Sequence, residues 1–305
     1  MRKSIIIPLF LFLILSVLAL DGLSPLRFVG EVFNEKVQGD SNNQEGTSYD
    51  NASELTGGTQ VHFIDVGQGD AIFIKLAGSN DILIDGGNRA DGETVVNYLK
   101  EQGVDDIELL IATHPHDDHM GGLPDVFDAF DVERVIDSGL TADTATYNMF
   151  MTAVQTEGAI YEEDAYQLFI WGNESLKILT GHDYWEEVND YSVVCRLDAG
   201  DIEFLFMGDA ESPAEADLSG DISTEILKVG HHGSDTGTTQ SFLDKVDPQA
   251  AIISVGTGNE YGHPNEEVLT RLKSNKVEIY RTDEQGNIIV TTNGSTYSIE
   301  ASSGP

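Results

Sequence analysis

The stretch THPHDDH at residues 113–119 decides how the rest of the sequence is interpreted. It sets His114, His116, Asp118 and His119 in one tight loop, in the pattern H-x-H-x-D-H. Imidazole nitrogens and carboxylate oxygens bind zinc, and also manganese or iron. Protonated histidines this close together would repel one another, so metal binding gives a physical reason for their proximity. The pattern predicts a site for two neighbouring divalent ions, and the alternative is an exposed polar turn.

The segments around this loop predict a layered α/β fold. The loop follows IELLIAT at 107–113, a continuous apolar run typical of a buried strand. Helical periodicity is expected at 94–102 and 144–156. Further strands are expected at 61–66, 71–76, 81–87, 176–179, 192–197 and 203–207, and strands and helices then alternate to about residue 299. Such an order favours sheets covered by helices.

The glycine-rich segment DVGQGD at 65–70 has two interpretations. Its spacing resembles a loop that cradles phosphate, but it joins two expected strands and opens no helix. We therefore interpret it as the turn of a hairpin, with Gly67 and Gly69 as turn residues.

The N-terminal part of the chain differs in composition from the rest. Residues 1–20 combine Arg2 and Lys3 with a nearly unbroken apolar run, which predicts a signal peptide or a membrane anchor. Residues 21–58 are expected to form a disordered linker, because their composition becomes polar and acidic toward residue 58. The catalytic domain is expected at 59–305. The chain would thus be exported, and either secreted or anchored on the outer face of the membrane.

The overall charge restricts the binding partners. Lys and Arg total 16 against 53 Asp and Glu, which gives a net charge of −37. Such a surface repels phosphate backbones and anionic lipids, so strong non-specific nucleic-acid binding is not expected. Contact with a membrane is expected only through the N-terminal segment. Cys195 is the single cysteine of the sequence, so any metal must use histidines and carboxylates.

Several motifs, in order, carry a resemblance to a known family. The HPHDDH loop preceded by ILIDGG resembles the metallo-β-lactamase superfamily, whose members share a four-layered αββα sandwich. VHFIDVGQGDAIFI, FLFMGD, ILKVGHHGS, AIISVG and YGHP further resemble the hydrolase domain of the ComEC family of DNA-uptake competence proteins. The match extends over roughly residues 60–299.

The resemblance implies a set of metal ligands. It assigns His114 and His116 to a first metal, and Asp118 and His119 to a second. Asp209 would bridge the two ions, although a helix N-cap is the alternative for this residue. One ligand is expected from the pair His231 and His232. We favour His232, which directly precedes a glycine, and expect His231 to contact substrate. The ions are expected to be two zinc ions, with manganese or iron as alternatives.

Other positions are assigned less directly. Asp85 is expected to accept a hydrogen bond from the histidine loop without binding metal itself. The position where many members of the superfamily have a further histidine reads EVND at 187–190. Asn189 or Asp190 would replace it, and His182 is the only imidazole nearby. His263 is either a phosphate contact or a turn residue at a helix entry.

The implied chemistry is hydrolysis by a hydroxide that bridges two metal ions, with Asp118, Asp209 and His231 as catalytic residues. Phosphodiester cleavage is the first expectation, because of the resemblance to the hydrolase domain of the ComEC family. His119 resembles a histidine found in the phosphodiesterase, nuclease and thioester-hydrolase branches of the superfamily. A small or single-phosphodiester substrate fits the acidic surface. The alternatives are a lactonase or thioester hydrolase on the same metals, and an inactive metal-binding surface module.

Overall fold

A computed structural model describes residues 58–163, 166–179 and 185–302. The expected signal peptide or anchor lies outside these ranges, as do nearly all of the expected linker and His182. No helix within the described ranges has both the length and the apolar character needed to cross a membrane.

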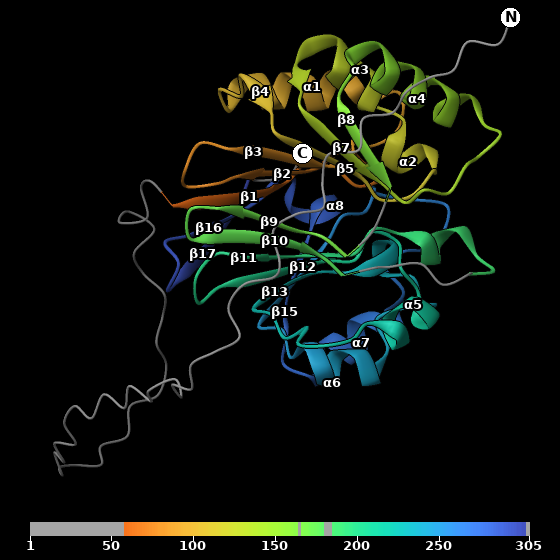
Figure 1. Ribbon diagram of the computed structural model, residues 1–305. Coiled ribbons are helices and arrows are strands. Elements are labelled where there is room, and N and C mark those ends of the chain that lie inside the picture. Colours follow the sequence, from red (N-terminus) through yellow and green to blue (C-terminus); the bar gives the residue numbers. More distant parts are fainter. Residues whose placement is uncertain (1–57, 164–165, 180–184, 303–305) are drawn as a thin grey trace, which may run out of the picture. The chain divides into compact units, whose positions relative to one another are not determined.

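Two sheets face each other in the described part of the chain (Figure 1). The first has eight strands in the order β17 (Tyr297–Ala301), β16 (Ile288–Thr292), β1 (Thr59–Phe63), β2 (Ile72–Lys75), β3 (Asp81–Ile84), β5 (Leu109–Ala112), β7 (Arg134–Asp137) and β8 (Ile160–Glu163). The second has seven, in the order β15 (Glu278–Arg281), β14 (Ala250–Ile253), β13 (Ile226–Lys228), β12 (Glu203–Phe206), β11 (Cys195–Asp198), β10 (Glu174–Ile178) and β9 (Leu168–Trp171). A short parallel pair joins β4 (Asp106–Ile107) and β6 (Asp131–Val132).

Both sheets contain a run of parallel strands, which matters for the site. Strands β3, β5, β7 and β8 pair in parallel in the first sheet, and β12 to β15 do so in the second. The carboxyl ends of parallel strands meet at one edge of a sheet, so the loops that follow them are brought together.

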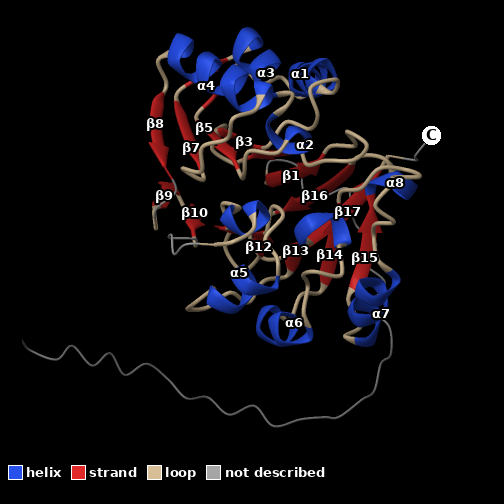
Figure 2. Cartoon of the chain, turned by 90° about the vertical axis from the view of Figure 1, so that its right-hand side faces the viewer, coloured by secondary structure: helices blue, strands red, loops and turns tan. Residues whose placement is uncertain are grey.

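Helices cover the outer face of each sheet (Figures 1 and 2). The first sheet carries α1 (Gly92–Glu101), α3 (Leu123–Ala129) and α4 (Ala145–Glu157), and the second carries α5 (Ser212–Asp217), α6 (Gln240–Val246) and α7 (Glu266–Ser274). Shorter turns are α2 (Asp117–Met120), α8 (Thr282–Gln285), η1 (Val188–Tyr191) and η2 (Gly230–Gly233). Local sequence fixes the ends of α4, the longest helix among the described residues: Thr144 accepts a hydrogen bond from the backbone N–H of Tyr147, and Gly158 ends the helix with positive φ.

The apolar core forms three layers that match this arrangement. One lies between the sheets and includes Phe63, Phe204 and Phe206, all almost completely buried. The other two lie between each sheet and its helices. Burying an aromatic side chain of this size contributes about 1.5–3 kcal/mol. The expected four-layered αββα sandwich is therefore confirmed.

Local differences from the sequence-based prediction have tertiary causes. The strand expected at 192–197 begins at Cys195, because Val193 instead donates its N–H to the carbonyl of Thr113 beside the histidine loop. The hairpin interpretation of residues 65–70 is confirmed, since β1 and β2 pair antiparallel on either side of it.

Candidate metal centre

The predicted site residues come from loops at the carboxyl ends of neighbouring strands. Asp85 follows β3, and the histidine loop at 113–119 follows β5 in the same sheet. Asp209 follows β12, while His231 and His232 follow β13 in the second sheet. Contacts between His119 and Asp209 join the two sheets at this edge. Parallel pairing thus brings residues together within each sheet, and the packing of one sheet on the other joins the two sets.

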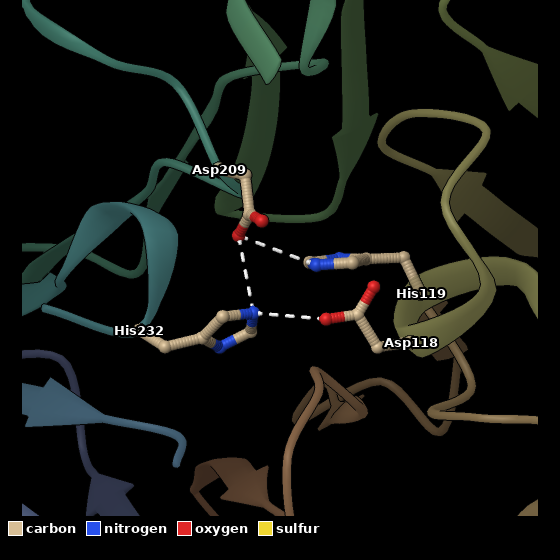
Figure 3. Close-up of side chains that lie close together, drawn as sticks. All are labelled: Asp118, His119, Asp209 and His232. Carbon is tan, nitrogen blue, oxygen red and sulfur yellow. Dashed lines mark ion pairs between the residues drawn. The ribbon is translucent and has the colours of Figure 1, made fainter. Parts of the chain in front are cut away.

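Four side chains form what we call the His232 group: Asp118, His119, Asp209 and His232 (Figure 3). His232 Nε2 lies 3.4 Å from Asp118 Oδ2 and 3.5 Å from Asp209 Oδ1. His119 Nε2 lies 3.2 Å from the same Asp209 oxygen. The ligand atoms of the group all lie within 4.8 Å of one another, so a single ion could contact all four residues.

A second cluster, the His114 group, contains His114, His116 and Asp209. His114 Nε2 lies 2.9 Å from His116 Nδ1 and 3.8 Å from Asp209 Oδ2. Asp209 therefore presents Oδ1 to the His232 group and Oδ2 to the His114 group. This is the arrangement that a carboxylate needs to reach two ions.

Buried polar atoms show that these residues fit divalent ions. His119 Nε2, His232 Nε2 and Asp209 Oδ1 are buried without a hydrogen-bond partner among the described residues. Leaving such an atom unsatisfied costs about 1–3 kcal/mol. All three atoms converge on one point, and the donor set of imidazole nitrogens and carboxylate oxygens suits zinc.

The pKa values in the cluster divide the histidines into two pairs. Burial, with a smaller contribution from His119, lowers the pKa of His114 well below its ordinary value, and burial also lowers the pKa of His116. Burial alone would lower the pKa of His119 and His232 as well, but Asp209 and other carboxylates outweigh it. The pKa of His119 is raised, and that of His232 is raised to about 10. A divalent ion must displace these protons, so metal binding is expected to weaken as the pH falls.

Asp85 lies behind the His232 group. Its Oδ1 accepts the N–H of Thr113 at 2.8 Å, and its Oδ2 accepts the Thr113 hydroxyl at 2.7 Å. The same Oδ2 lies 2.7 Å from His119 Nδ1, which turns Nε2 of that ring toward Asp209. The structure thus gives Asp85 contacts suited to orienting a ligand histidine.

The structure separates the two consecutive histidines. His231 and His232 both have positive φ, 48° and 52°, which costs about 1–2 kcal/mol for a residue with a side chain. His232 lies in the ligand group and its Nδ1 lies 2.9 Å from the carbonyl oxygen of Ser254. His231 is partly exposed, with Nδ1 3.0 Å from Glu211 Oε1. The strained turn therefore directs one ring toward the cluster and leaves the other at its rim.

Of the two residues expected to replace the missing histidine, Asp190 belongs to neither ligand cluster, and Asn189 has a buried Oδ1 without a hydrogen-bond partner among the described residues. Asp190 is buried and accepts backbone N–H groups of Glu211 and Ala214, which satisfies the first turn of α5. Asn189 donates to Glu211 and lies 3.3 Å from His231 Nδ1. Sequence reasoning missed Ser192, whose hydroxyl accepts the N–H of Asp209 and lies 3.4 Å from His114 Nδ1.

A cavity of about 340 Å³ opens onto these groups. His263 forms part of its wall, edge-on to His231 with ring centroids 5.4 Å apart, and it stacks on Tyr261 at 5.7 Å. Tyr261 is 71% exposed at the rim. A larger hollow of about 830 Å³ beside Trp171 and Gly294 contains none of the predicted site residues. Several of the predicted site residues line the smaller cavity.

Comparison with known proteins identifies the family of this chain. The model of the metallo-β-lactamase superfamily matches residues 64–257, so the chain belongs to the metallo-β-lactamase superfamily. It is 30% identical over 260 residues to ComE operon protein 3 of Bacillus subtilis, covering 75% of this chain and 32% of that protein. It is also 30% identical over 228 residues to competence protein ComA of Neisseria gonorrhoeae, covering 73% and 30%. The resemblance to the ComEC family is confirmed, and the chain spans about a third of the length of these relatives.

A similar solved structure is a mutant of CmlA β-hydroxylase, with a TM-score of 0.49 and 13% identity. The match covers 81% of this chain and 55% of that one.

Proposed function

We propose that this chain is a two-metal phosphodiesterase that acts on small or single phosphodiesters. The observation that carries the proposal is the position of Asp209, which offers one carboxylate oxygen to each of two clusters of buried ligand atoms. Paired ions a few ångströms apart stabilise both the attacking and the leaving oxygen of a phosphoryl centre. Zinc is the ion that the donor set favours.

The ligands divide between the two clusters. His114, His116 and Asp209 would hold one ion, and the His232 group would hold the other. When bound, the ions supply Lewis acidity and lower the pKa of a coordinated water from about 16 to about 7. The burial of Asp209, only 2% exposed, excludes bulk water from the ligand atoms and strengthens their attraction for cations.

Two side chains that line the cavity would contact the substrate. His231 lines the cavity, and its contact with Glu211 fixes the ring so that Nε2 lies 3.8 Å from Asp209 Oδ2. A hydrogen bond from this nitrogen would orient a phosphoryl oxygen beside the ions. Asp118 also lines the cavity, with 26% of its side chain exposed. Burial alone would raise the pKa of its carboxyl, but His232 and His119 outweigh burial and lower it well below its ordinary value, so Asp118 would face the reacting group as an ionised carboxylate as well as bind metal.

The cavity itself supports a small substrate. Its volume is at the lower end of ligand pockets, which range over about 300–1,000 Å³. No lysine or arginine occurs among the described residues that line it. A long polyanion would find no basic path to follow there, whereas one phosphate needs only the ions and His231.

We also propose export for this chain, with residues 1–20 acting as signal peptide or anchor. Support comes from the composition of that segment alone: two cations followed by an apolar run.

The test is a substrate panel on purified full-length chain with measured metal content. We expect bis(p-nitrophenyl) phosphate to be hydrolysed faster than a lactone or a thioester, and chelation to abolish the activity. His62→Phe is the matched control, because His62 is buried in the first sheet away from both clusters. Bound metal with faster lactone or thioester hydrolysis would overturn the phosphodiesterase proposal, and bound metal without any activity would favour an inactive binding module.

A further inference from the structure

A buried ion pair lies directly behind the metal centre. Lys228 ends the otherwise apolar strand β13, and none of its side chain is exposed. Its Nζ lies 2.7 Å from Oδ2 of Asp70, which is 1% exposed, and also donates to the carbonyl oxygen of Val229 at 3.0 Å. Asp70 belongs to the 65–70 hairpin of the first sheet, so the pair links the two sheets.

The side chain of Asp70 reaches a proposed metal ligand. Its Oδ1 lies 3.5 Å from Nδ1 of His232, the nitrogen that also lies 2.9 Å from the carbonyl oxygen of Ser254. The other nitrogen of this ring faces Asp118 and Asp209. The Ser254 carbonyl is the nearer acceptor for this nitrogen, and the Asp70 carboxylate adds an electrostatic attraction on the same side of the ring, which helps to fix the orientation with which the other nitrogen meets a metal ion.

The backbone of Asp70 reaches a second ligand. Its N–H donates to the carbonyl oxygen of Asp118 at 3.1 Å. The adjacent Gly69 has a φ of 145°, and a Cβ at that position would lie 2.4 Å from the same oxygen. The hairpin can therefore approach α2 this closely only with glycine at position 69.

Stability alone does not explain a buried Asp70–Lys228 pair. Removing two charges from water costs several kcal/mol for each ion, and apolar residues of similar size often stabilise a fold as well or better. Neither residue lines the cavity at the metal centre, so neither is placed to touch a substrate. Their contacts lead instead to two members of the His232 group.

We propose that Asp70, held in place by Lys228, is a positioning residue for His232. This role rests on the proposed metal centre. Loss of a carboxylate behind a ligand histidine typically lowers metal affinity about 10–100-fold. The loss should be confined to the ion of the His232 group, because within the described residues Asp70 contacts Lys228, His232 and Asp118 but neither His114 nor His116.

The experiment separates positioning from stabilisation. Asp70→Asn, Lys228→Met and the double variant would be titrated as full chains with Co²⁺ against a competing chelator, with the Co²⁺ spectrum and Tm recorded. Each single variant should lose Tm, because it leaves a buried charge unpaired. The double variant should regain Tm, while its second equivalent of Co²⁺ still binds about 10–100-fold more weakly and with an altered spectrum.

The matched control is Arg196→Met with Glu203→Gln, which removes an ion pair of 3.1 Å at the other end of β12. It should leave both equivalents of Co²⁺ unchanged. A double Asp70/Lys228 variant with wild-type affinity and spectrum would show that the pair is only structural and would overturn the inference. A wild-type chain that binds two ions but cleaves no phosphodiester would refute the proposed function, while the predicted loss in the double variant would still support the positioning role.

Discussion

Replacing Asp85 by asparagine should loosen one metal ion and leave the fold in place. Asp85 has a φ of 61°, a conformation that asparagine tolerates better than most other residues, so the backbone is not strained by the change. The carboxylate accepts three donors: the N–H and hydroxyl of Thr113, and Nδ1 of His119. An asparagine has a single acceptor oxygen and presents its NH₂ group to the other side, so at least one donor loses its partner.

The magnitude follows from these contacts. An unpaired buried donor costs about 1–3 kcal/mol, which is the expected loss in free energy of unfolding of the metal-free chain. If the His119 contact is the one lost, affinity for the ion of the His232 group should fall about 10–100-fold. The ion of the His114 group should be affected less, because Asp85 contacts His119 directly and reaches His114 only through the Thr113 hydroxyl, which lies 3.1 Å from His114 Nδ1.

Chelator competition with Zn²⁺ measures the two affinities, and urea unfolding of the metal-free chain measures stability. Asp137→Asn is the matched control: Asp137 is also a buried aspartate at the end of a parallel strand, and it accepts the N–H of Gly139 at 2.7 Å outside both ligand groups. It should lose stability and keep metal affinity. Two equivalents of Zn²⁺ bound by Asp85→Asn with wild-type affinity would refute the reasoning.

Three further outcomes are expected. Asp209→Asn should reduce kcat/KM more than replacing any single ligand histidine by alanine does, because the aspartate charge faces both ions. Equal losses across all of these variants would contradict a bridging role. His62→Phe should flatten the pH dependence of the free energy of unfolding. Burial lowers the pKa of His62 from 6.5 to about 4, so the unfolded chain binds more protons at this residue than the folded chain does. The free energy of unfolding of the wild type should therefore fall by up to about 3 kcal/mol between pH 7 and pH 4. Urea unfolding at both pH values checks this, and an equal loss in the variant would exclude His62 as the cause. The rate of hydrolysis of a small phosphodiester should exceed that of long duplex DNA at low salt. The difference should shrink at higher salt, because salt screens the net charge of −37. Faster cleavage of the duplex at low salt would reveal a basic path that the described cavity lacks.

Local patterns in the sequence were sufficient for a layered α/β fold and for the histidine loop, whereas the four-layered αββα arrangement was implied by the family resemblance. The loop at 113–119 follows a strand of consecutive apolar residues, and ligand spacing within seven residues does not depend on distant contacts. The order of strands and helices predicts layers but not this juxtaposition. Parallel pairing places the ends of β12 and β13 side by side, and the packing of the two sheets brings the end of β5 to them through the contact of His119 with Asp209.

Only the tertiary structure decided which side chains share a ligand cluster and which accept hydrogen bonds from the backbone. Positive φ at both His231 and His232 directs one ring inward and leaves the other at the rim, and no local pattern specifies that turn. Asp190 lies where a ligand was expected, yet it accepts hydrogen bonds from the backbone at the start of α5. Asp70 and Lys228 read as a turn residue and a strand residue in sequence. They meet because the two sheets pack face to face. Both side chains are buried, so each charge would be unpaired and costly without the other.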